Sequence, residues 1–183
     1  MQSLIQITRR RWLMRQGARA ASLGAAALAL PARAGSAHAI ALVHTHTRES
    51  IDIVYARGGQ VVPEAMAAIN RFLRDHYTGD VGVIDPALLD QLQRVRLALG
   101  SARAFEVISG YRSPHTNARL RAQGGGGVAQ HSLHMEGRAI DVRLPGTALA
   151  ELRDAALDLH LGGVGFYARE AFVHLDSGRV RHW

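Results

Sequence analysis

The sequence contains no cysteine and no lysine, and aromatic residues make up only 5% of its 183 residues. The absence of cysteine excludes disulfide bonds, thiolate metal sites, iron-sulfur clusters and cysteine nucleophiles. The low aromatic content leaves few rings on which nucleic-acid bases could stack. With 48% hydrophobic residues, the chain is nevertheless long enough to form one domain with its own core.

Hydrophobic runs long enough to cross a bilayer are also missing. The longest run, residues 18–30, follows an arginine-rich segment and is shorter than the roughly 20 residues that a spanning helix needs. Together with the small-residue pattern Ala37-His38-Ala39, it predicts a secretory signal over residues 1–39 that is cleaved before Ile40. Within this signal, Thr8-Arg9-Arg10-Arg11-Trp12-Leu13 is similar to the twin-arginine export motif. We therefore expect a periplasmic protein that contacts the membrane only through its export signal, with an uncleaved anchor helix as the alternative.

The basic charge belongs mainly to this signal. The whole chain has 22 arginines and 15 acidic residues, but residues 40–183 contain 16 of the arginines and all of the acids. A domain with nearly balanced charge lacks the electrostatic footprint of a nucleic-acid-binding protein. Nucleic acid is therefore not expected as a partner, and the nine histidines of residues 40–183 become the more informative feature.

Residues 40–183 predict an α+β domain with a small, mostly antiparallel sheet flanked by helices, because short strands alternate irregularly with helices. The expected strands are residues 41–46, 51–55, 105–109, 138–144, 164–167 and 171–176. The expected helices are residues 63–76, 86–100, 114–124 and 147–161, and the first has an apolar face that includes Leu73 and Tyr77. Asp85-Pro86 and Ser113-Pro114 are typical helix starts.

Histidine and aspartate residues in two of these strands predict a metal site. Side chains alternate between the faces of a strand, so Asp141 should point away from the core while Ile140 and Val142 face it. By the same rule, His174 and Asp176 share a face of the last strand. Histidine and carboxylate side chains could complete a three-ligand zinc site that keeps its fourth position for water, as catalytic sites do. His44 and His46 also alternate, but there a solvated strand face is the better interpretation than a second metal site.

Several motifs resemble one family. Ser132 to Asp141 fits the pattern Ser-x-His-x-x-Gly-x-Ala-x-Asp of zinc D-Ala-D-Ala-type peptidases, the M15-like group that shares its fold with the hedgehog signalling domain. Ser109 to Pro114 and the segment from Phe172 to Trp183 also fit. With His46 to Ser50, the order of these motifs is most similar to exported murein endopeptidases of the DUF882, or YcbK-like, branch. The resemblance covers nearly all of residues 40–183.

The resemblance implies roles for individual residues. His134, Asp141 and His174 would hold one Zn²⁺ per chain. Arg112 would stabilise negative charge on the scissile carbonyl or bind a substrate carboxylate, since its planar guanidinium pairs with carboxylate oxygens and stays charged. Ser132 would contact the substrate.

The general base is less clear, because Ala171 stands where many relatives have an acidic residue. Three other residues are candidates: His182, Asp176 and Glu170. We favour His182, because imidazole titrates near neutral pH and so suits proton transfer. Asp176 could instead orient a ligand imidazole.

The resulting hypothesis is a zinc metallopeptidase that hydrolyses peptide cross-links of peptidoglycan, most simply as a monomer. A D,D- or L,D-carboxypeptidase that trims stem peptides is the alternative within enzymes. A catalytically silent zinc-bearing domain that binds the cell wall is the alternative outside them.

Overall fold

The computed structural model describes residues 37–123 and 128–183, so most of the predicted export signal and the glycine-rich segment 124–127 lie outside the described residues. The strands are β1 (Ala37–His44), β2 (Ser50–Arg57), β3 (Gln60–Val61), β4 (Phe105–Ser109), β5 (Ala139–Arg143), β6 (Gly163–Tyr167), β7 (Phe172–Asp176) and β8 (Arg181–His182). The helices are α1 (Pro63–Phe72), α2 (Pro86–Ala98), α3 (Pro114–Ala122), α4 (Leu149–Asp158) and the 3₁₀ helix η1 (Leu133–Glu136). Among them, none is both long and apolar enough to cross a membrane.

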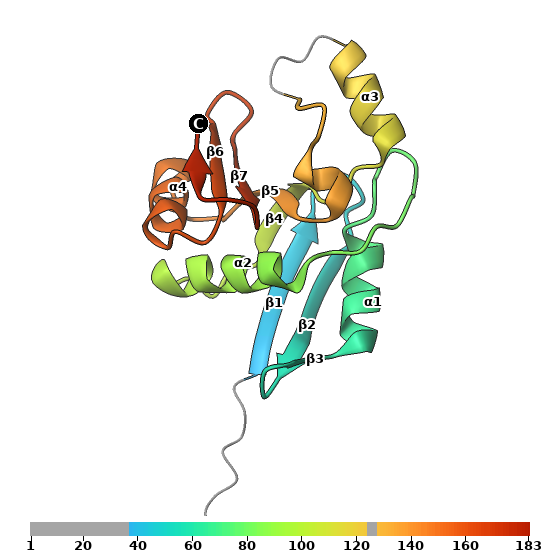
Figure 1. Cartoon of the computed structure of the whole chain (residues 1–183). Coiled ribbons are helices and arrows are strands. Elements are labelled where there is room, and N and C mark those ends of the chain that lie inside the picture. The colour runs from blue at the N-terminus through green and yellow to red at the C-terminus, as the bar shows by residue number, and fades with distance from the viewer. Residues whose placement is uncertain (1–36, 124–127) are drawn as a thin grey trace, which may run out of the picture. The chain divides into compact units, whose positions relative to one another are not determined.

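The strands form a single sheet in the order β3-β2-β1-β4-β5-β7-β6-β8 (Figure 1). Neighbouring strands are antiparallel except for the pairs β1/β4 and β6/β8, which are parallel. The prediction of an α+β fold with a mostly antiparallel sheet is therefore confirmed. The neighbouring central strands β5 and β7 carry Asp141 and His174, two of the three predicted metal ligands.

Helices cover one face of the sheet and form the core there. α1 packs against β2, α2 against β1, and α4 against β6 and β7. The inward-facing strand residues are fully buried, among them Ile40, Leu42, Phe105, Val107, Ile140, Val142, Val173 and Leu175. They contact buried leucines and valines of α2, such as Leu92 and Val95. Burial of this apolar surface is the main force that fixes the strand register, because a one-residue slip would turn every one of these side chains outward.

Two helices start as predicted. The Asp85 side chain accepts a hydrogen bond from the backbone N–H of Ala87 at 3.0 Å, and Ser113 Oγ accepts one from Thr116 at 3.2 Å. In each case a proline takes the first helical position, where its missing N–H costs nothing.

The first predicted helix ends four residues too late, and the placement of Tyr77 on its apolar face was wrong. α1 stops at Phe72, and Tyr77 is 52% exposed. The cause is Asp75, whose carboxylate accepts hydrogen bonds from the backbone N–H of Tyr77 and from Ser113. Such side-chain bonds offer the backbone an alternative to the helix and favour a turn.

Candidate metal centre and active site

The three predicted metal ligands come from three elements at the centre of the fold. His134 lies in η1, Asp141 in β5 and His174 in β7, and Asp141 and His174 are paired residues of neighbouring antiparallel strands. Gly137 lets the chain turn from η1 into β5. Its backbone has φ 66°, and a Cβ there would collide with the carbonyl oxygen of Val83.

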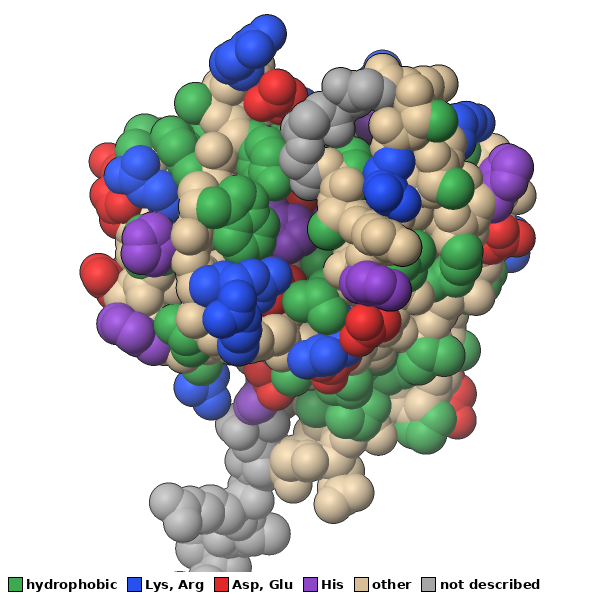
Figure 2. All heavy atoms as spheres, turned by 45° about the horizontal axis from the view of Figure 1, so that its top comes forward, with side chains coloured by type: hydrophobic (Ala, Val, Ile, Leu, Met, Phe, Trp, Pro, Cys, Tyr) green, Lys and Arg blue, Asp and Glu red, His purple; other side chains and the backbone are tan. Residues whose placement is uncertain are grey.

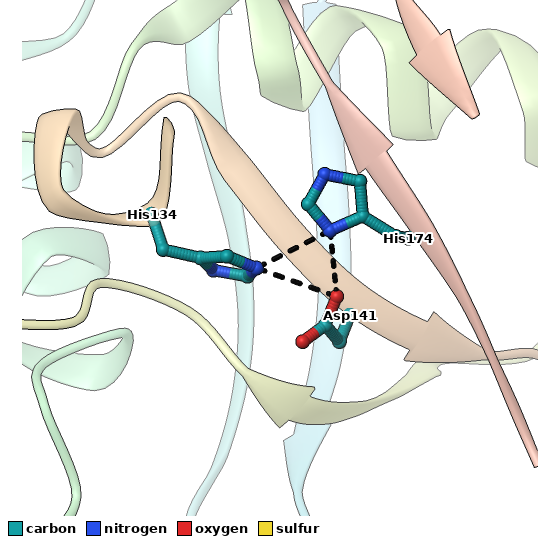
Figure 3. Close-up of side chains that lie close together, drawn as sticks. All are labelled: His134, Asp141 and His174. Carbon is teal, nitrogen blue, oxygen red and sulfur yellow. Dashed lines mark hydrogen bonds and ion pairs between the residues drawn. The ribbon is translucent and has the colours of Figure 1, made fainter. Parts of the chain in front are cut away.

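The side chains of these three residues converge on one point (Figure 3). His174 Nδ1 lies 2.8 Å from Asp141 Oδ1, and His134 Nε2 lies 3.3 Å from His174 Nδ1 and 3.4 Å from Asp141 Oδ1. One donor atom from each residue falls within 4.8 Å of the others. Among the described residues this is the one group of histidine and acidic side chains that meets this condition.

The remaining nitrogens of both imidazoles have partners that aim the free nitrogens at this point. His134 Nδ1 donates to the carbonyl oxygen of Gly110 at 2.7 Å, which leaves its Nε2 as the ligand atom. His174 Nε2 donates to Asp176 Oδ2 at 3.2 Å, which leaves its Nδ1. Metal-binding histidines are usually held in this way. Two imidazole nitrogens and one carboxylate oxygen are also a donor set that suits a divalent transition metal with an open fourth position.

The electrostatics of the site fit the same use. Burial lowers the pKa of His134, so this imidazole stays neutral and able to bind a metal. Burial would raise the pKa of Asp141, but the neighbouring His134 and His174 outweigh it and hold this pKa below its ordinary range. Burial also opposes a charge on His174, yet its hydrogen bonds with Asp141 and Asp176 raise its pKa. Asp141 is therefore an anionic ligand, and a metal ion would displace the proton of His174.

A cavity of about 470 Å³ opens above these residues, large enough for a peptide segment. Figure 2 shows histidine side chains inside a hollow, with hydrophobic and cationic side chains beside them. Ser132 and Arg112 both line the cavity, as the resemblance implied. The Arg112 guanidinium lies 3.8 Å from Asp141 Oδ2 and 3.5 Å from Asn117 Oδ1. Both contacts are long, so among the described residues the side-chain partners of Arg112 leave donors for a substrate.

The three candidates for the general base lie in different environments. His182 is exposed and is not among the residues that line the cavity, although its neighbours Arg181 and Trp183 are. Strand alternation explains this, because β8 turns residues 181 and 183 toward the cavity and residue 182 away. Asp176 is fully buried, and Arg181 holds its carboxylate with two hydrogen bonds. The same carboxylate accepts from His174 Nε2, so its position orients that imidazole. Glu170 is exposed and lines the cavity.

Sequence reasoning gave no role to an aromatic surface beside the metal ligands. Tyr167, Phe172 and Trp183 line the cavity and come from β6, β7 and the residue after β8. The rings of His174 and Trp183 are 5.3 Å apart between centroids. The alternation of residues along these strands could have indicated the shared face, but the parallel pairing of β8 with β6 has no local signal in the sequence.

A second group of histidines is packed rather than arranged around a point. His46 and His76 stack with ring centroids 4.1 Å apart and planes at 3°, and His44 lies beneath them, 5.5 Å from His76. Two parallel rings cannot both point their nitrogens at one ion. The strand face around His44 is not solvated as expected, because His44 is fully buried.

The fold and the site together define an α+β domain in which two histidines and an aspartate could hold a metal ion on the floor of a cleft, as in a metal-dependent enzyme. Residues 32–183 match the profile of a family described as peptidoglycan L,D-endopeptidase MepK. The peptidoglycan L,D-endopeptidase MepK of Escherichia coli K12 is 43% identical over 166 residues, which cover 88% of this chain and 91% of the relative. The probable MepK of Haemophilus influenzae is 38% identical over 142 residues, 77% of this chain and 75% of the relative. The chain belongs to this M15-like family of peptidoglycan endopeptidases.

Proposed function

We propose that this chain is a zinc-dependent L,D-endopeptidase that cleaves peptide cross-links of peptidoglycan. The observation that carries the proposal is the convergence of His134 Nε2, Asp141 Oδ1 and His174 Nδ1 on the floor of a peptide-sized cavity. The specificity for an L,D bond is taken from the names of the relatives from E. coli and H. influenzae.

His134, Asp141 and His174 would hold the zinc ion, one per chain. Zinc is the preferred ion because two imidazoles and one carboxylate with an open fourth position are the ligand set of hydrolytic zinc sites. Such an ion supplies a Lewis acid that polarises a carbonyl and lowers the pKa of a coordinated water to about 7. The chain itself supplies the orientation of the ligands through Gly110 and Asp176.

Arg112 is proposed to bind oxygen atoms of the substrate beside the scissile bond. Its weak contacts with Asn117 and Asp141 support this role, because they position the guanidinium without saturating its five donors. As negative charge develops on the scissile carbonyl, a donor fixed in advance stabilises it without reorganisation.

Glu170 is the residue that we propose as proton acceptor, in place of His182. Its position on the cavity lining supports this assignment, because a base has to reach the attacking water and then the leaving amine. It occupies the turn between β6 and β7, one position before Ala171.

Export by a twin-arginine signal, action in the periplasm and kinship with the D-Ala-D-Ala-type peptidase and hedgehog folds complete the proposal. The murein substrate supports a periplasmic location, since this polymer lies outside the inner membrane.

The test is digestion of purified cross-linked sacculi by zinc-loaded protein, with the muropeptides identified by mass spectrometry. We expect L,D cross-linked dimers to disappear and their monomers to accumulate, and a chelator to stop the reaction.

Arg112→Ala should bind zinc normally and lose about two to three orders of magnitude in kcat. Glu170→Gln should lose activity while His182→Gln keeps it.

Other products would point to other functions. Release of single terminal residues would identify a carboxypeptidase, and unchanged muropeptides would leave the chain as a zinc-bearing wall-binding domain. Activity of Glu170→Gln with loss in His182→Gln would restore His182 as the base.

A further inference from the structure

One wall of the cavity presents a continuous aromatic surface. The rings of Tyr167 and Phe172 stack with centroids 4.6 Å apart, and Trp183 Nε1 donates to the Tyr167 hydroxyl at 2.9 Å. All three side chains line the cavity, and Trp183 is 49% exposed. We call Tyr167, Phe172 and Trp183 the aromatic wall.

The indole of Trp183 is held in place on several sides. The guanidinium of Arg181 lies 4.9 Å from its ring centroid, and Arg181 itself is fixed by two bonds to Asp176. Behind the indole stands Gly165, where an added Cβ would come within 2.7 Å of the ring. The backbone of Trp183 is bonded to Val164 and Phe166. A ring that is fixed before binding loses little conformational entropy when a ligand packs on it.

The aromatic wall and Arg112 flank the metal ligands on different sides. Arg112 lies beside Asp141, at 3.8 Å, whereas Trp183 lies beside His174, at 5.3 Å between ring centroids. Because the scissile bond has to lie over the ligands, one flanking residue of the substrate meets Arg112 and the other meets the aromatic wall. The cation beside that wall, Arg181, is paired with Asp176 through both of its terminal nitrogens. The two sides therefore select different chemistry.

We propose that the aromatic wall is a binding subsite for the aliphatic side chain of the residue that contributes the scissile carbonyl. Arg112 then lies on the amine side, where its guanidinium has donors both for the scissile carbonyl oxygen and for the carboxyl group that the D-centre carries next to the scissile nitrogen. This assignment rests on the proposed L,D-endopeptidase function. Each methylene buried on the wall strengthens binding about four-fold.

A sugar ring is the other ligand that stacks on aromatic faces, but the distance to the metal ligands disfavours it. The Trp183 ring lies beside the ring of His174, 5.3 Å away between centroids. A group that packs on Trp183 therefore lies within one residue of the scissile bond. The sugars of peptidoglycan are separated from the cross-link by several residues of the stem peptide. A peptide side chain is therefore the occupant.

The test uses two synthetic, sugar-free cross-linked peptides that differ only in the carbonyl-side residue, with either three methylenes or one in its side chain. For zinc-loaded wild type we expect a KM about 15-fold lower for the long-chain peptide, since it has two more methylenes. Trp183→Ala should raise this KM about 15-fold, abolish the preference and keep kcat within about three-fold, with zinc still stoichiometric. Trp183→Phe should keep most of the preference, and Leu97→Ala, on the exposed face of α2, is the control that leaves both constants unchanged.

Calorimetric binding of the same peptides with a reduced, non-hydrolysable scissile bond separates this inference from the proposed function. A chain-length preference in Kd that disappears in Trp183→Ala supports the subsite even where no peptide is cleaved, in which case the endopeptidase proposal alone fails. Equal Kd values for both peptides, or an unchanged preference in Trp183→Ala, would overturn the subsite. A response to the substitution that is confined to sugar-bearing peptides would overturn it as well.

Discussion

Both imidazole nitrogens of His174 have partners in the candidate metal site. One of its nitrogens faces Asp141 and His134, and the other is held by Asp176. Asp176 has no exposed surface and accepts bonds from the Arg181 guanidinium and from the backbone N–H groups of residues 163 and 178. Burial would raise the pKa of Asp176, but its hydrogen bonds with His174, with Arg181 and with the backbone N–H of residue 178 hold this pKa below the ordinary range. Asp176 therefore acts on the metal site through His174.

Replacement of Asp176 tests this positioning role. Asp176→Asn keeps the shape of the side chain but removes the charge that holds the His174 imidazole, so zinc affinity should fall by about 10- to 100-fold. Competition with a chromophoric chelator measures this affinity. Asp154→Asn changes an exposed carboxylate on α4 and serves as the matched control. An unchanged affinity in Asp176→Asn would show that Arg181 and the strand backbone suffice to orient His174.

At the scale of elements, the turn between β6 and β7 is strained next to the cavity. Ala171 adopts φ 57°, a left-handed conformation that costs a non-glycine residue about 1–2 kcal/mol. The turn precedes β7, which carries His174, and contains Glu170. Strain of this kind often lies at functional sites.

Ala171→Gly should relieve the strain and raise the free energy of unfolding by about 0.5–1 kcal/mol, after the greater flexibility of glycine in the unfolded chain is subtracted. Denaturant titration at constant zinc measures the change. Ala155→Gly, in the interior of α4, should have the opposite sign and cost about 1 kcal/mol. If Ala171→Gly destabilises as much as Ala155→Gly, the positive φ of Ala171 stores no strain.

The packed histidines at the end of β1 and in the turn after α1 make stability depend on pH. Burial, with the charges of neighbouring histidines, lowers the pKa of His44 and of His76 to about 4. Because the unfolded chain takes up these protons near pH 6.5 and the folded chain only near pH 4, the free energy of unfolding should fall as the pH is lowered from 6.5 to 4 and then level off. Other charged groups that act on these two histidines are Glu49, Arg74, Asp75, Arg112 and Arg119.

Thermal denaturation between pH 7 and 4 measures this dependence. His76→Phe keeps a ring against His46 and removes one of the two titrations, so its curve should be shallower than that of the wild type. His115→Gln, an exposed residue of α3, should reproduce the wild-type slope. Parallel curves for all three proteins would show that His76 does not contribute to the pH dependence.

Much of this element structure follows from local sequence signals, and the exceptions have physical reasons. The strands with Asp141 and His174 alternate so regularly that their outward faces, and thus the metal site, are predictable. The two-residue strand β8 is not, since its pairing with β6 depends on residues that are distant in sequence. For the same reason, no local signal indicates that Glu170 lines the cavity and His182 does not. α1 ended early because the side-chain bonds of Asp75 to Ser113 join segments that no local pattern connects.

At the scale of the whole molecule, the sheet lies between the hydrophobic core and the candidate metal site. The helices α1, α2 and α4 and the apolar core lie on one of its faces, while Asp141 and His174 project from the other. The ligands come from η1, β5 and β7, which meet only in the folded chain. A metal ion that binds the folded chain alone must therefore stabilise it.

Removal of zinc should lower the melting temperature. At a free zinc concentration 100 times the Kd, binding contributes about 2.7 kcal/mol, which corresponds to roughly 5–10 °C for a chain of this size. Scanning calorimetry with and without a chelator measures the shift. His134→Ala should melt at the same temperature in both conditions, and a chelator effect that persists in this variant would place the metal elsewhere.

The signal cleavage predicted before Ile40 would fall inside the first strand of the sheet. β1 already begins at Ala37, and Ala37, His38 and Ala39 are paired with β2 at Arg57, Ala56 and Val54. His38 is also bonded to Asp90, and Arg96 donates to the carbonyl oxygen of Ala39. A peptidase needs an extended, unpaired segment in its own cleft, so a cut between Ala39 and Ile40 competes with the closing of this strand. A chain that is exported already folded would be cut only as fast as the end of β1 detaches from the sheet.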